Sequence, residues 1–345
     1  MGNLPKLSYV LLSYNREKYI RSAVESAFAQ DYEGELEYIF SDDCSTDRTF
    51  EIIKECVAAY KGNRRVVVTQ TPHNVHLAGN INHALQFAAG DFIVRADDDD
   101  ISCRNRCALV AKAIQYAPNC SYVLGGWQAF TDKTENEVKE QALRACPIKQ
   151  DFRIIDVAHT AKMDSRDWGY NHQAWKRTAF TEFGPLSKAV YFIEDYVTLL
   201  RANVLGVAVI TDELFAYIRK GEAQMSTSNG ARDSSTPQDI IAHELNTTRA
   251  YTDAYHPLLE EFDRLIQRVP SCCEENRRAN IINYLNAERE KHIRSYPAIT
   301  HWQTPFLKRL DRALKQDKIT LFTLIRSLPL PVFAFIISIV RKIRK

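Results

Sequence analysis

Several features that would mark a particular class of protein are scarce or missing from this sequence of 345 residues. The net charge is only +2, which argues neither for nor against a nucleic-acid partner. Our prediction is that the protein has no nucleic-acid partner. The eight cysteines follow no regular framework. Cys103 and Cys107 are four residues apart, as two ligands on one helix face would be, but no further Cys or His pair has zinc-finger spacing. We therefore predict reduced thiols and no thiolate metal site.

Long hydrophobic runs are also scarce, and no internal repeat or low-complexity tract is present. No long apolar core follows Met1, so we expect no signal peptide. The apolar run from Leu328 to Val340 is shorter than the ~20 residues of an ordinary membrane span and contains two prolines. Together with the basic residues 341–345, it predicts a segment that lies on a membrane surface. A core helix and a dimer contact are the alternatives.

The first hundred residues contain a regular alternation of strand and helix patterns. Short β-rich apolar runs alternate with segments whose apolar residues recur at helical spacing, such as Ile20, Val24 and Phe28. The predicted strands lie in 7–15, 35–47, 64–71 and 91–100, and the predicted helices in 16–30, 48–60 and 76–90. This order predicts an α/β fold with a Rossmann-like, doubly wound, mostly parallel sheet and right-handed crossovers.

The second half has a less regular pattern. It predicts strands in 121–130 and 207–219, helices in 150–161 and 194–206, and a strand or turn followed by a helix in 171–184. Residues 220–239 are rich in Ser, Gly and polar side chains and predict a mobile loop. Residues 240–315 are highly charged and helical in pattern, which predicts a helical C-terminal extension.

Polar clusters stand at the carboxyl ends of three predicted strands. They are Ser13-Tyr14-Asn15, Asp42-Asp43 and Asp97 to Asp100. In open α/β sheets, ligands bind beyond the carboxyl ends of the strands, so the fold should collect these clusters along one edge. The run of four aspartates is then expected to line a site. The alternative is a solvated acidic turn.

Three segments resemble the nucleotide-binding half of family 2 glycosyltransferases, which have the GT-A fold. They are LSYVLLSYNREKYIRSAVESAFAQ (7–30), SDDCSTDRTFEII (41–53) and GNINHALQFAAGDFIVRADDDDIS (79–102). The resemblance is strong over 7–102 and traceable to about Arg219, and it fits bacterial surface-polysaccharide glycosyltransferases. It implies transfer of a sugar from a nucleotide-activated donor, usually with inversion at the anomeric carbon. It also implies a divalent metal held by a D-x-D motif.

By this resemblance, Asp97 and Asp99 form the D-x-D pair, and alternation along an extended chain would point both to one side. Mn²⁺ or Mg²⁺ neutralises a donor diphosphate and binds oxygen ligands, typically with one or two carboxylates. We expect Asp99 to be the direct ligand and Asp97 to bind the metal or face the ribose. Asp100 is expected to be either a second ligand or a group that contacts the ligands from behind. Asp98 holds the variable position, as a donor contact or a solvated side chain.

The resemblance also assigns the nucleotide contacts. Asp42 and Asp43 match a turn in which a carboxylate accepts a hydrogen bond from the nucleobase, and either can fill that role. Capping of the following helix is the better interpretation for Ser45 and Asp47. At the end of the first strand, we expect Ser13, Tyr14 and Asn15 to form the floor on which the base stacks. Arg16, which follows them, is expected to contact the phosphate. A buried structural role is an equal alternative for the tyrosine.

An E-D pair stands at the start of a predicted helix. An inverting transfer needs a base for the acceptor hydroxyl, and a carboxylate at a helix start suits that task. By the resemblance we expect Asp195 to be the base and Glu194 to position it or contact the acceptor. Two carboxylates that merely favour the helix dipole are the alternative.

One stretch departs from the family pattern. Many members carry a histidine after the last sheet strand, where it helps to hold metal or diphosphate. Here the matching stretch AYIRKGEAQMS has Arg219 and Lys220 and no histidine, so either cation is a candidate for the diphosphate. Trp168 and Trp175 precede the E-D pair and suit either sugar stacking or core packing.

Taken together, these patterns predict a GT-A transferase domain, 1–225, with halves 1–102 and 103–225. A helical region, 226–318, and a membrane-associating tail, 319–345, follow. We expect a metal-dependent hexosyltransferase that moves a sugar from a UDP-sugar to a glycan or lipid-linked glycan, at the cytoplasmic face of the cell membrane. A sugar-phosphate nucleotidyltransferase is the runner-up, but LLSYNREKYI lacks its Gly-rich phosphate loop. An inactive GT-A scaffold in an assembly complex is the other alternative.

Overall fold

A computed structural model describes residues 4–144, 148–149, 151–155, 173–188, 194–220, 237–269, 275–299 and 330–343. The chain forms two compact units. The first contains Met1–Lys220 and Glu260–Ala287, and the second contains Gly221–Leu259 and Glu288–Lys345. The predicted boundaries of 1–225, 226–318 and 319–345 stay a prediction, although the first unit also takes in Glu260–Ala287, which the sequence pattern assigns to the helical region.

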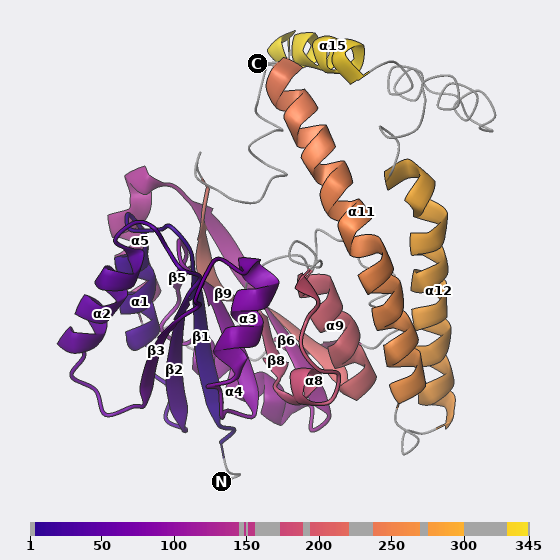
Figure 1. Ribbon diagram of the computed structural model, residues 1–345. Coiled ribbons are helices and arrows are strands. Elements are labelled where there is room, and N and C mark those ends of the chain that lie inside the picture. Colours follow the sequence, from indigo (N-terminus) through magenta and orange to yellow (C-terminus); the bar gives the residue numbers. More distant parts are fainter. Residues whose placement is uncertain are drawn as a thin grey trace. The chain divides into compact units, whose positions relative to one another are not determined.

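The predicted alternation in the first hundred residues is confirmed (Figure 1). In chain order the elements are β1 (Leu7–Ser13), α1 (Ile20–Phe28), β2 (Leu36–Asp42), α2 (Thr49–Ala59), β3 (Val66–Gln70), α3 (His76–Leu85) and β4 (Phe92–Asp97). The strands run parallel in the order β3-β2-β1-β4. The helix α3 ends five residues before Gly90, where we expected it to stop. A Cβ at Gly90 would lie 2.4 Å from the Ser8 backbone N, so the chain can enter β4 this closely only with glycine.

The second half extends the same sheet with mixed strand directions. Its elements are β5 (Ile101–Ser102), α4 (Arg106–Tyr116), β6 (Cys120–Phe130), η1 (Asp132–Thr134), α5 (Glu135–Leu143), β7 (Arg153–Ile155), β8 (Gln173–Lys176), α8 (Thr178–Thr181), α9 (Glu194–Leu205) and β9 (Val207–Arg219). β8 pairs antiparallel with both β4 and β6, and β9 runs parallel to β6. The helix predicted in 150–161 is wrong for its described part, because Arg153–Ile155 forms a strand paired with β9. The predicted loop 220–239 falls almost wholly outside the described residues.

Alternation along the strands sorts side chains onto the two faces of the sheet, and helices cover both (Figure 1). Leu7, Tyr9 and Leu11 of β1 point into the largest apolar core, which α1, α2 and α4 complete. Ser41 of β2 faces the opposite side, where its hydroxyl donates to Asn80 of α3 over 2.5 Å. The described cysteines Cys44, Cys56, Cys103, Cys107 and Cys120 are free thiols, as predicted.

In the described part of the chain, the sheet is followed by the helices α11 (Pro237–Arg268), α12 (Glu275–Ile299) and α15 (Leu330–Ile343). The C-terminal part of α11 belongs to the first unit. There Glu261 accepts from the Nε of the fully buried Arg201 of α9 over 2.7 Å. No described helix combines the length and the apolar character needed to cross a bilayer. The basic segment 306–318 lies outside the described residues.

Candidate active site

The three polar clusters lie side by side at one edge of the sheet, as predicted. In the parallel register Ser13 is opposite Asp42, and Leu12 is opposite Asp97, so the strands β1, β2 and β4 end at the same level. The chain leaves β1 through Asn15, whose φ of 52° is left-handed. Asn is one of the few residues that adopt this conformation readily, which explains how the chain turns so sharply here.

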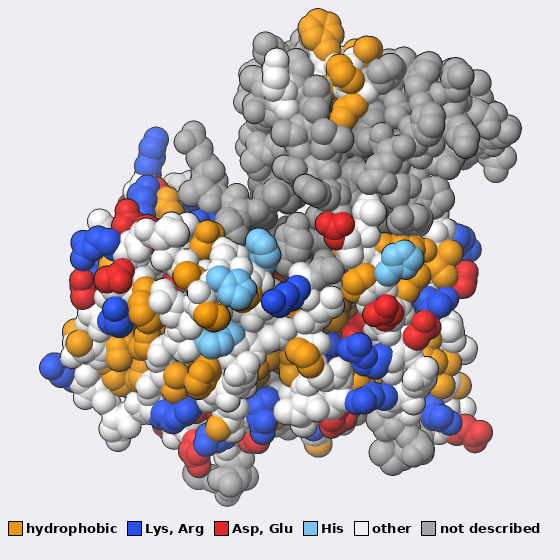
Figure 2. Space-filling model, viewed as in Figure 1, with side chains coloured by type: hydrophobic (Ala, Val, Ile, Leu, Met, Phe, Trp, Pro, Cys, Tyr) orange, Lys and Arg blue, Asp and Glu red, His pale blue; other side chains and the backbone are white. Residues whose placement is uncertain are grey.

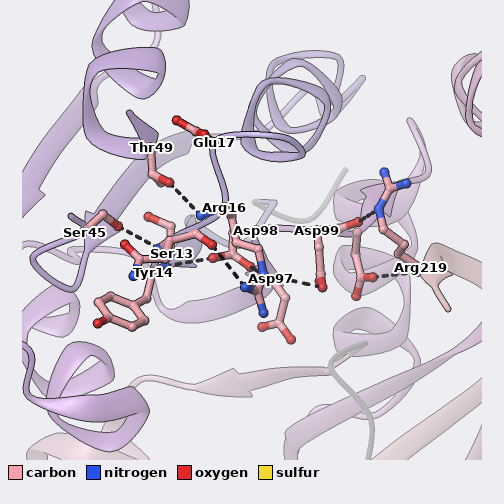
Figure 3. Close-up of polar contacts among 12 residues, drawn as sticks. Ser13, Tyr14, Arg16, Glu17, Ser45, Thr49, Asp97, Asp98, Asp99 and Arg219 are labelled. Carbon is pink, nitrogen blue, oxygen red and sulfur yellow. Dashed lines mark hydrogen bonds and ion pairs between the residues drawn. The ribbon is translucent and has the colours of Figure 1, made fainter. Parts of the chain in front are cut away.

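The loop after β1 is fixed against the loop after β2 (Figure 3). The Asn15 backbone N–H donates to Ser45 Oγ over 2.9 Å, and Arg16 N–H donates to Thr49 Oγ1 over 2.7 Å. Ser45 therefore bridges the two loops and does not cap the helix. Asp47 stands one residue before the N-cap Arg48, and its carboxylate accepts from the backbone N–H of Thr49, the first residue of α2, over 2.9 Å.

Asp42 is fully buried and is occupied by contacts within the protein. Its carboxylate accepts from the Ser45 backbone N–H at 2.8 Å and hydroxyl at 2.5 Å, from Gln70 Nε2 at 2.8 Å, and from Ser13 Oγ at 3.3 Å. These donors use the lone pairs of both oxygens. Asp42 thus holds the strand ends together.

Asp43 is buried to 3% exposure but has a different pattern of contacts. One oxygen, Oδ1, accepts from Thr71 Oγ1 at 2.8 Å and from the Val75 backbone N–H at 2.9 Å. Within the described residues no hydrogen bond is assigned to its other oxygen. Of the two adjacent aspartates, Asp43 is the one with an acceptor to spare.

The four aspartates after β4 do not continue the strand, because Asp98 and Asp99 form a turn. The alternation argument that points Asp97 and Asp99 to one side therefore does not apply. The solvated alternative for Asp98 is also wrong: it is only 9% exposed and accepts from the Tyr14 backbone N–H over 2.8 Å. Arg16 Nε lies 3.5 Å from Asp98 and 3.8 Å from Asp99 (Figure 3). Arg16 thus contacts aspartates of the run that the sequence places beside the donor phosphates.

Burial raises the pKa of all four aspartates. The pKa of Asp97 rises to about 6, although Arg95 opposes the rise. For Asp98 and Asp100, burial and the nearby charge of Asp99 raise the pKa well above 3.8. For Asp99 burial again raises the pKa, and Arg16 and Arg219 oppose it. The run is short of positive charge, and a divalent cation would relieve that shortage.

The residues of this turn fit a divalent metal ion that takes most of its ligands from water molecules and from the donor phosphates. The described residues contain no group of three His, Cys, Asp or Glu side chains arranged around one ion. Histidine side chains gather over α3 in Figure 2, but among the described residues they do not form such a group either. Mg²⁺ and similar ions are commonly held by one or two carboxylates and by substrate phosphates. Asp97 and Asp99 can supply that number.

Arg219 and Lys220 end β9 in different surroundings. The Arg219 side chain is 3% exposed, its Nε donates to the Asp99 carbonyl over 3.0 Å, and its backbone N–H donates to Asp100 over 3.0 Å. Its guanidinium also lies against two carboxylates and two rings, Asp132 at 2.6 Å, Glu135 at 3.0 Å, Tyr19 at 4.1 Å and Phe130 at 4.5 Å. These contacts hold Arg219 as a brace for the aspartate turn. The less buried Lys220 lies 5.3 Å from the Trp127 ring.

The E-D pair begins α9, as predicted, and Arg95 links it to Asp97 at the start of the aspartate run. Arg95 Nη1 donates to Asp195 Oδ1 and lies 3.4 Å from Glu194 Oε1, while Nη2 lies 3.3 Å from Asp97 Oδ1. Burial and the charge of Asp195 raise the pKa of Glu194 to about 8. The raised pKa favours the protonated form of Glu194 at neutral pH.

Three residues of this arrangement were not singled out by sequence patterns. Gln173 of β8 donates from Nε2 to Asp195 Oδ1, and the Tyr122 hydroxyl of β6 donates to Gln173 Oε1. Arg95 stands in an apolar strand, and a charged residue there was the one available signal. Trp175 is 2% exposed and packs on Phe180, which supports the core alternative, whereas Trp168 lies outside the described residues.

Comparisons with known proteins agree with this arrangement. The family model for glycosyl transferase family 2 matches residues 8–179. The putative glycosyltransferase EpsE of Bacillus subtilis is 39% identical over 106 residues, which are 31% of this chain and 37% of that protein. The chain thus spans little more than a third of this relative.

Solved structures show the same fold. The Staphylococcus aureus TarS 1-349 structure in complex with UDP superposes with a TM-score of 0.57 at 17% identity, over 98% of this chain and 88% of that one. The mannosyltransferase PcManGT from Pyrobaculum calidifontis, in complex with GDP-Man and Mn²⁺, gives 0.52 at 15% identity, over 98% and 88%. The GT-A fold predicted from the sequence is confirmed, and the chain belongs to glycosyl transferase family 2.

Proposed function

We propose that the protein transfers a sugar from a nucleotide-sugar, preferably a UDP-sugar, to a glycan or lipid-linked glycan, with inversion and with a divalent metal. One observation carries the proposal: a single guanidinium, that of Arg95, contacts Asp97 on the donor side and Asp195 on the acceptor side. Donor phosphates bound at the aspartate turn would therefore lie close to a carboxylate that can act on an acceptor.

For the nucleotide, the proposal uses Asp43 and the loop after β1. The oxygen of Asp43 without an assigned partner is the better candidate to accept from a ring N–H of the base, since Asp42 is saturated by protein donors. The side chain of Tyr14 is part-exposed and points away from the aspartates in Figure 3, where it can form the floor under the base together with Ser13 and Asn15. The UDP complex of TarS supports a site for a uridine nucleotide in this fold.

For the diphosphate, Asp99 and Asp97 are the proposed metal ligands, with Asp100 as a further candidate behind them. Mn²⁺ or Mg²⁺ would supply charge that stabilises the leaving diphosphate. Arg16 and Lys220 are the proposed cations for the phosphate oxygens. The Mn²⁺ and GDP-Man complex of PcManGT supports such an arrangement.

For the chemical step, Asp195 is the proposed base. It takes the proton of the acceptor hydroxyl while that oxygen attacks the anomeric carbon, and the nucleoside diphosphate leaves from the opposite side. Glu194, which is largely protonated at neutral pH, is proposed to donate a hydrogen bond to the acceptor. A raised pKa on one of two adjacent carboxyls is a pattern by which the two take different roles.

The first test is a thermal-shift panel of UDP-, GDP- and dTDP-sugars with and without Mn²⁺. Ligands that bind the native state raise its melting temperature by mass action, by about 2.7 kcal/mol of unfolding free energy at a hundred times the Kd. We expect UDP-sugars to stabilise the protein in the presence of Mn²⁺. No stabilisation by any donor at millimolar concentration, with no release of nucleotide, would contradict the proposal.

We further propose that the C-terminal segment holds the enzyme on the cytoplasmic surface of a membrane. On α15, Val332 and Phe335 are 45% and 57% exposed, and hydrophobic side chains of this helix are visible on the surface in Figure 2. Pro331 stands in the first turn of α15, where a missing N–H costs nothing, so the segment can form a helix despite its prolines. An exposed apolar helix that ends in basic residues suits a surface with anionic lipids.

A further inference from the structure

Arg95 is a charged residue in an otherwise apolar stretch of β4, and the sheet itself does not need a charge at this position. It lies in β4 between Val94 and Ala96, both buried in the main core, and points to the opposite face. Its side chain is only 2% exposed. A buried arginine destabilises a fold unless its charge is paired and its donors are used. The charge of Arg95 is paired only by carboxylates of the candidate site, through Nη1 and Nη2, and its buried Nε has no hydrogen-bond partner in the described part of the chain.

The geometry of the guanidinium matters as much as its charge. Nη2 reaches Asp97 Oδ1 at 3.3 Å, and Nη1 reaches Asp195 Oδ1 and lies 3.4 Å from Glu194. Two separate nitrogen atoms of one rigid planar group thus contact two carboxylates from β4 and α9. A lysine ammonium is a compact point charge and cannot hold two carboxylates at a fixed separation in this way.

The same Asp195 oxygen has a second donor. Gln173 Nε2 donates to Oδ1, and Tyr122 donates its hydroxyl proton to Gln173 Oε1. Because Oε1 receives the tyrosine proton, the amide must turn its NH₂ group toward Asp195. Gln173 is fully buried and Tyr122 is 1% exposed, so this orientation is fixed by packing. Within the described residues no hydrogen bond is assigned to Asp195 Oδ2.

We infer that Arg95 and Gln173 are positioning residues that fix the rotation of the Asp195 carboxylate. They saturate Oδ1, and Oδ2 becomes the oxygen that takes the acceptor proton. Arg95 also ties this carboxylate to Asp97, so that base and donor keep one relative position. In the step itself the acceptor O–H bond breaks and its proton passes to Oδ2. The oxygen forms the new bond to the anomeric carbon, and the electron pair of the old bond leaves with the nucleoside diphosphate. The inference rests on the proposed function.

The test measures UDP binding and turnover separately in the full chain. Binding is measured by calorimetry with UDP and Mn²⁺, and turnover by UDP release from UDP-N-acetylglucosamine, UDP-glucose and UDP-galactose. For Gln173→Met we expect kcat to fall by about 10- to 100-fold, as for loss of one hydrogen bond to a charged group. The Kd of UDP should stay within about twofold of that of the unmodified protein, since Gln173 does not touch the donor side. Tyr122→Phe acts through Gln173 and should lower kcat by a smaller factor, about 3- to 10-fold.

The arginine is tested by a conservative variant and a matched control. Arg95→Lys keeps the charge but loses the planar group with two separate nitrogen donors, so we expect kcat to fall by at least about 10-fold. Arg201→Lys is the control, because Arg201 is also fully buried and lies on the same helix as Asp195, but its partner is Glu261. That variant should melt at a lower temperature and keep the kcat and KM of the unmodified protein.

The outcomes separate the two proposals. An unmodified protein that neither binds UDP nor releases it from any donor overturns the proposed function, and the inference with it. An active unmodified protein whose folded Gln173→Met and Arg95→Lys variants keep their kcat overturns the inference alone. So does a loss of UDP affinity in Gln173→Met as large as the loss of kcat, because Gln173 would then serve the donor.

Discussion

Replacing Asp195 by asparagine separates the chemistry from the binding of the donor. In the native protein Arg95 and Gln173 both donate to Oδ1. In the variant these two donors select the amide orientation that places its carbonyl oxygen at the Oδ1 position. The NH₂ group must then occupy the position of Oδ2, where the proposed base acts. The variant offers a donor there, and it cannot take a proton.

The size of each effect follows from these contacts. Loss of general base catalysis should lower kcat by about 10²- to 10⁴-fold. Arg95 loses a charged partner but keeps Asp97 at 3.3 Å, so we expect a loss of about 2 kcal/mol of stability, as for one hydrogen bond to a charged group. For a fold of this size that loss corresponds to about 4 to 8 °C in melting temperature. Without the charge of Asp195, the pKa of Glu194 should fall from about 8, and its ionisation would partly restore the pairing of Arg95.

The assay compares Asp195→Asn with Glu194→Gln in calorimetry with UDP and Mn²⁺ and in UDP release. Glutamine resembles the protonated Glu194 present at neutral pH, so Glu194→Gln should cost less than about tenfold in kcat. Asp195→Asn should bind UDP with nearly unchanged affinity. If UDP affinity falls as much as kcat, Asp195 is a donor or structural residue. If Glu194→Gln is the more damaging variant, the roles of the two carboxyls are exchanged.

Three further perturbations test other parts of the site and fold. Asp99→Ala should lower turnover at saturating Mn²⁺ by at least ~100-fold, or on the order of 3 kcal/mol, and near-normal turnover would refute its role as a metal ligand. Burial alone would raise the pKa of Glu37, but hydrogen bonds from Ser8, Ala89 and Arg65 hold that pKa below 4.5. The ionised Glu37 therefore stabilises the fold above about pH 4.5, and this stabilisation is lost as the pH falls through the lowered pKa. Glu37→Gln should therefore lower the melting temperature at pH 7 and make little difference near pH 3; an equal difference at both pH values would exclude this role. Truncation after Ser327 should leave a folded enzyme that no longer sediments with anionic vesicles. Vesicle binding of the full chain should weaken with salt without vanishing, because the four cations of 341–345 contribute about 1 kcal/mol each near the surface. Insoluble truncated protein would instead show that the segment packs in the core.

The arrangement of the site was predictable from the sequence where the fold itself imposes it. Parallel strands end at one edge, so apolar runs that stop at Ser13, Asp42 and Asp97 are enough to place these residues together. The E-D pair was predictable for a similar reason, since carboxylates favour the first turn of a helix and Glu194 begins α9.

The sequence could not reveal which partners each polar group finds. Asp42 and Asp43 are chemically identical neighbours, and the tertiary positions of donors such as Gln70 at the end of β3 and Thr71 just after it decide which one is saturated. Asp98 is buried because the Tyr14 backbone N–H needs an acceptor, and backbone donors leave no trace in the side-chain pattern. Gln173 lies 22 residues before Asp195 on another strand, so no local spacing joins them.

The buried ion pair of Arg201 and Glu261 limits how far the polypeptide can be truncated from its C-terminus without loss of the fold. The match to the family model ends at residue 179 and the last described strand of the sheet ends at Arg219, yet the carboxylate partner of Arg201 lies sixty residues further along the chain. A shortened polypeptide that stops soon after the sheet would leave a guanidinium inside the fold without a counter-charge, a defect of about 3 to 5 kcal/mol. The shortest independently folding version of this protein should therefore run to about Ala287, where the first compact unit ends, and not only to residue 179.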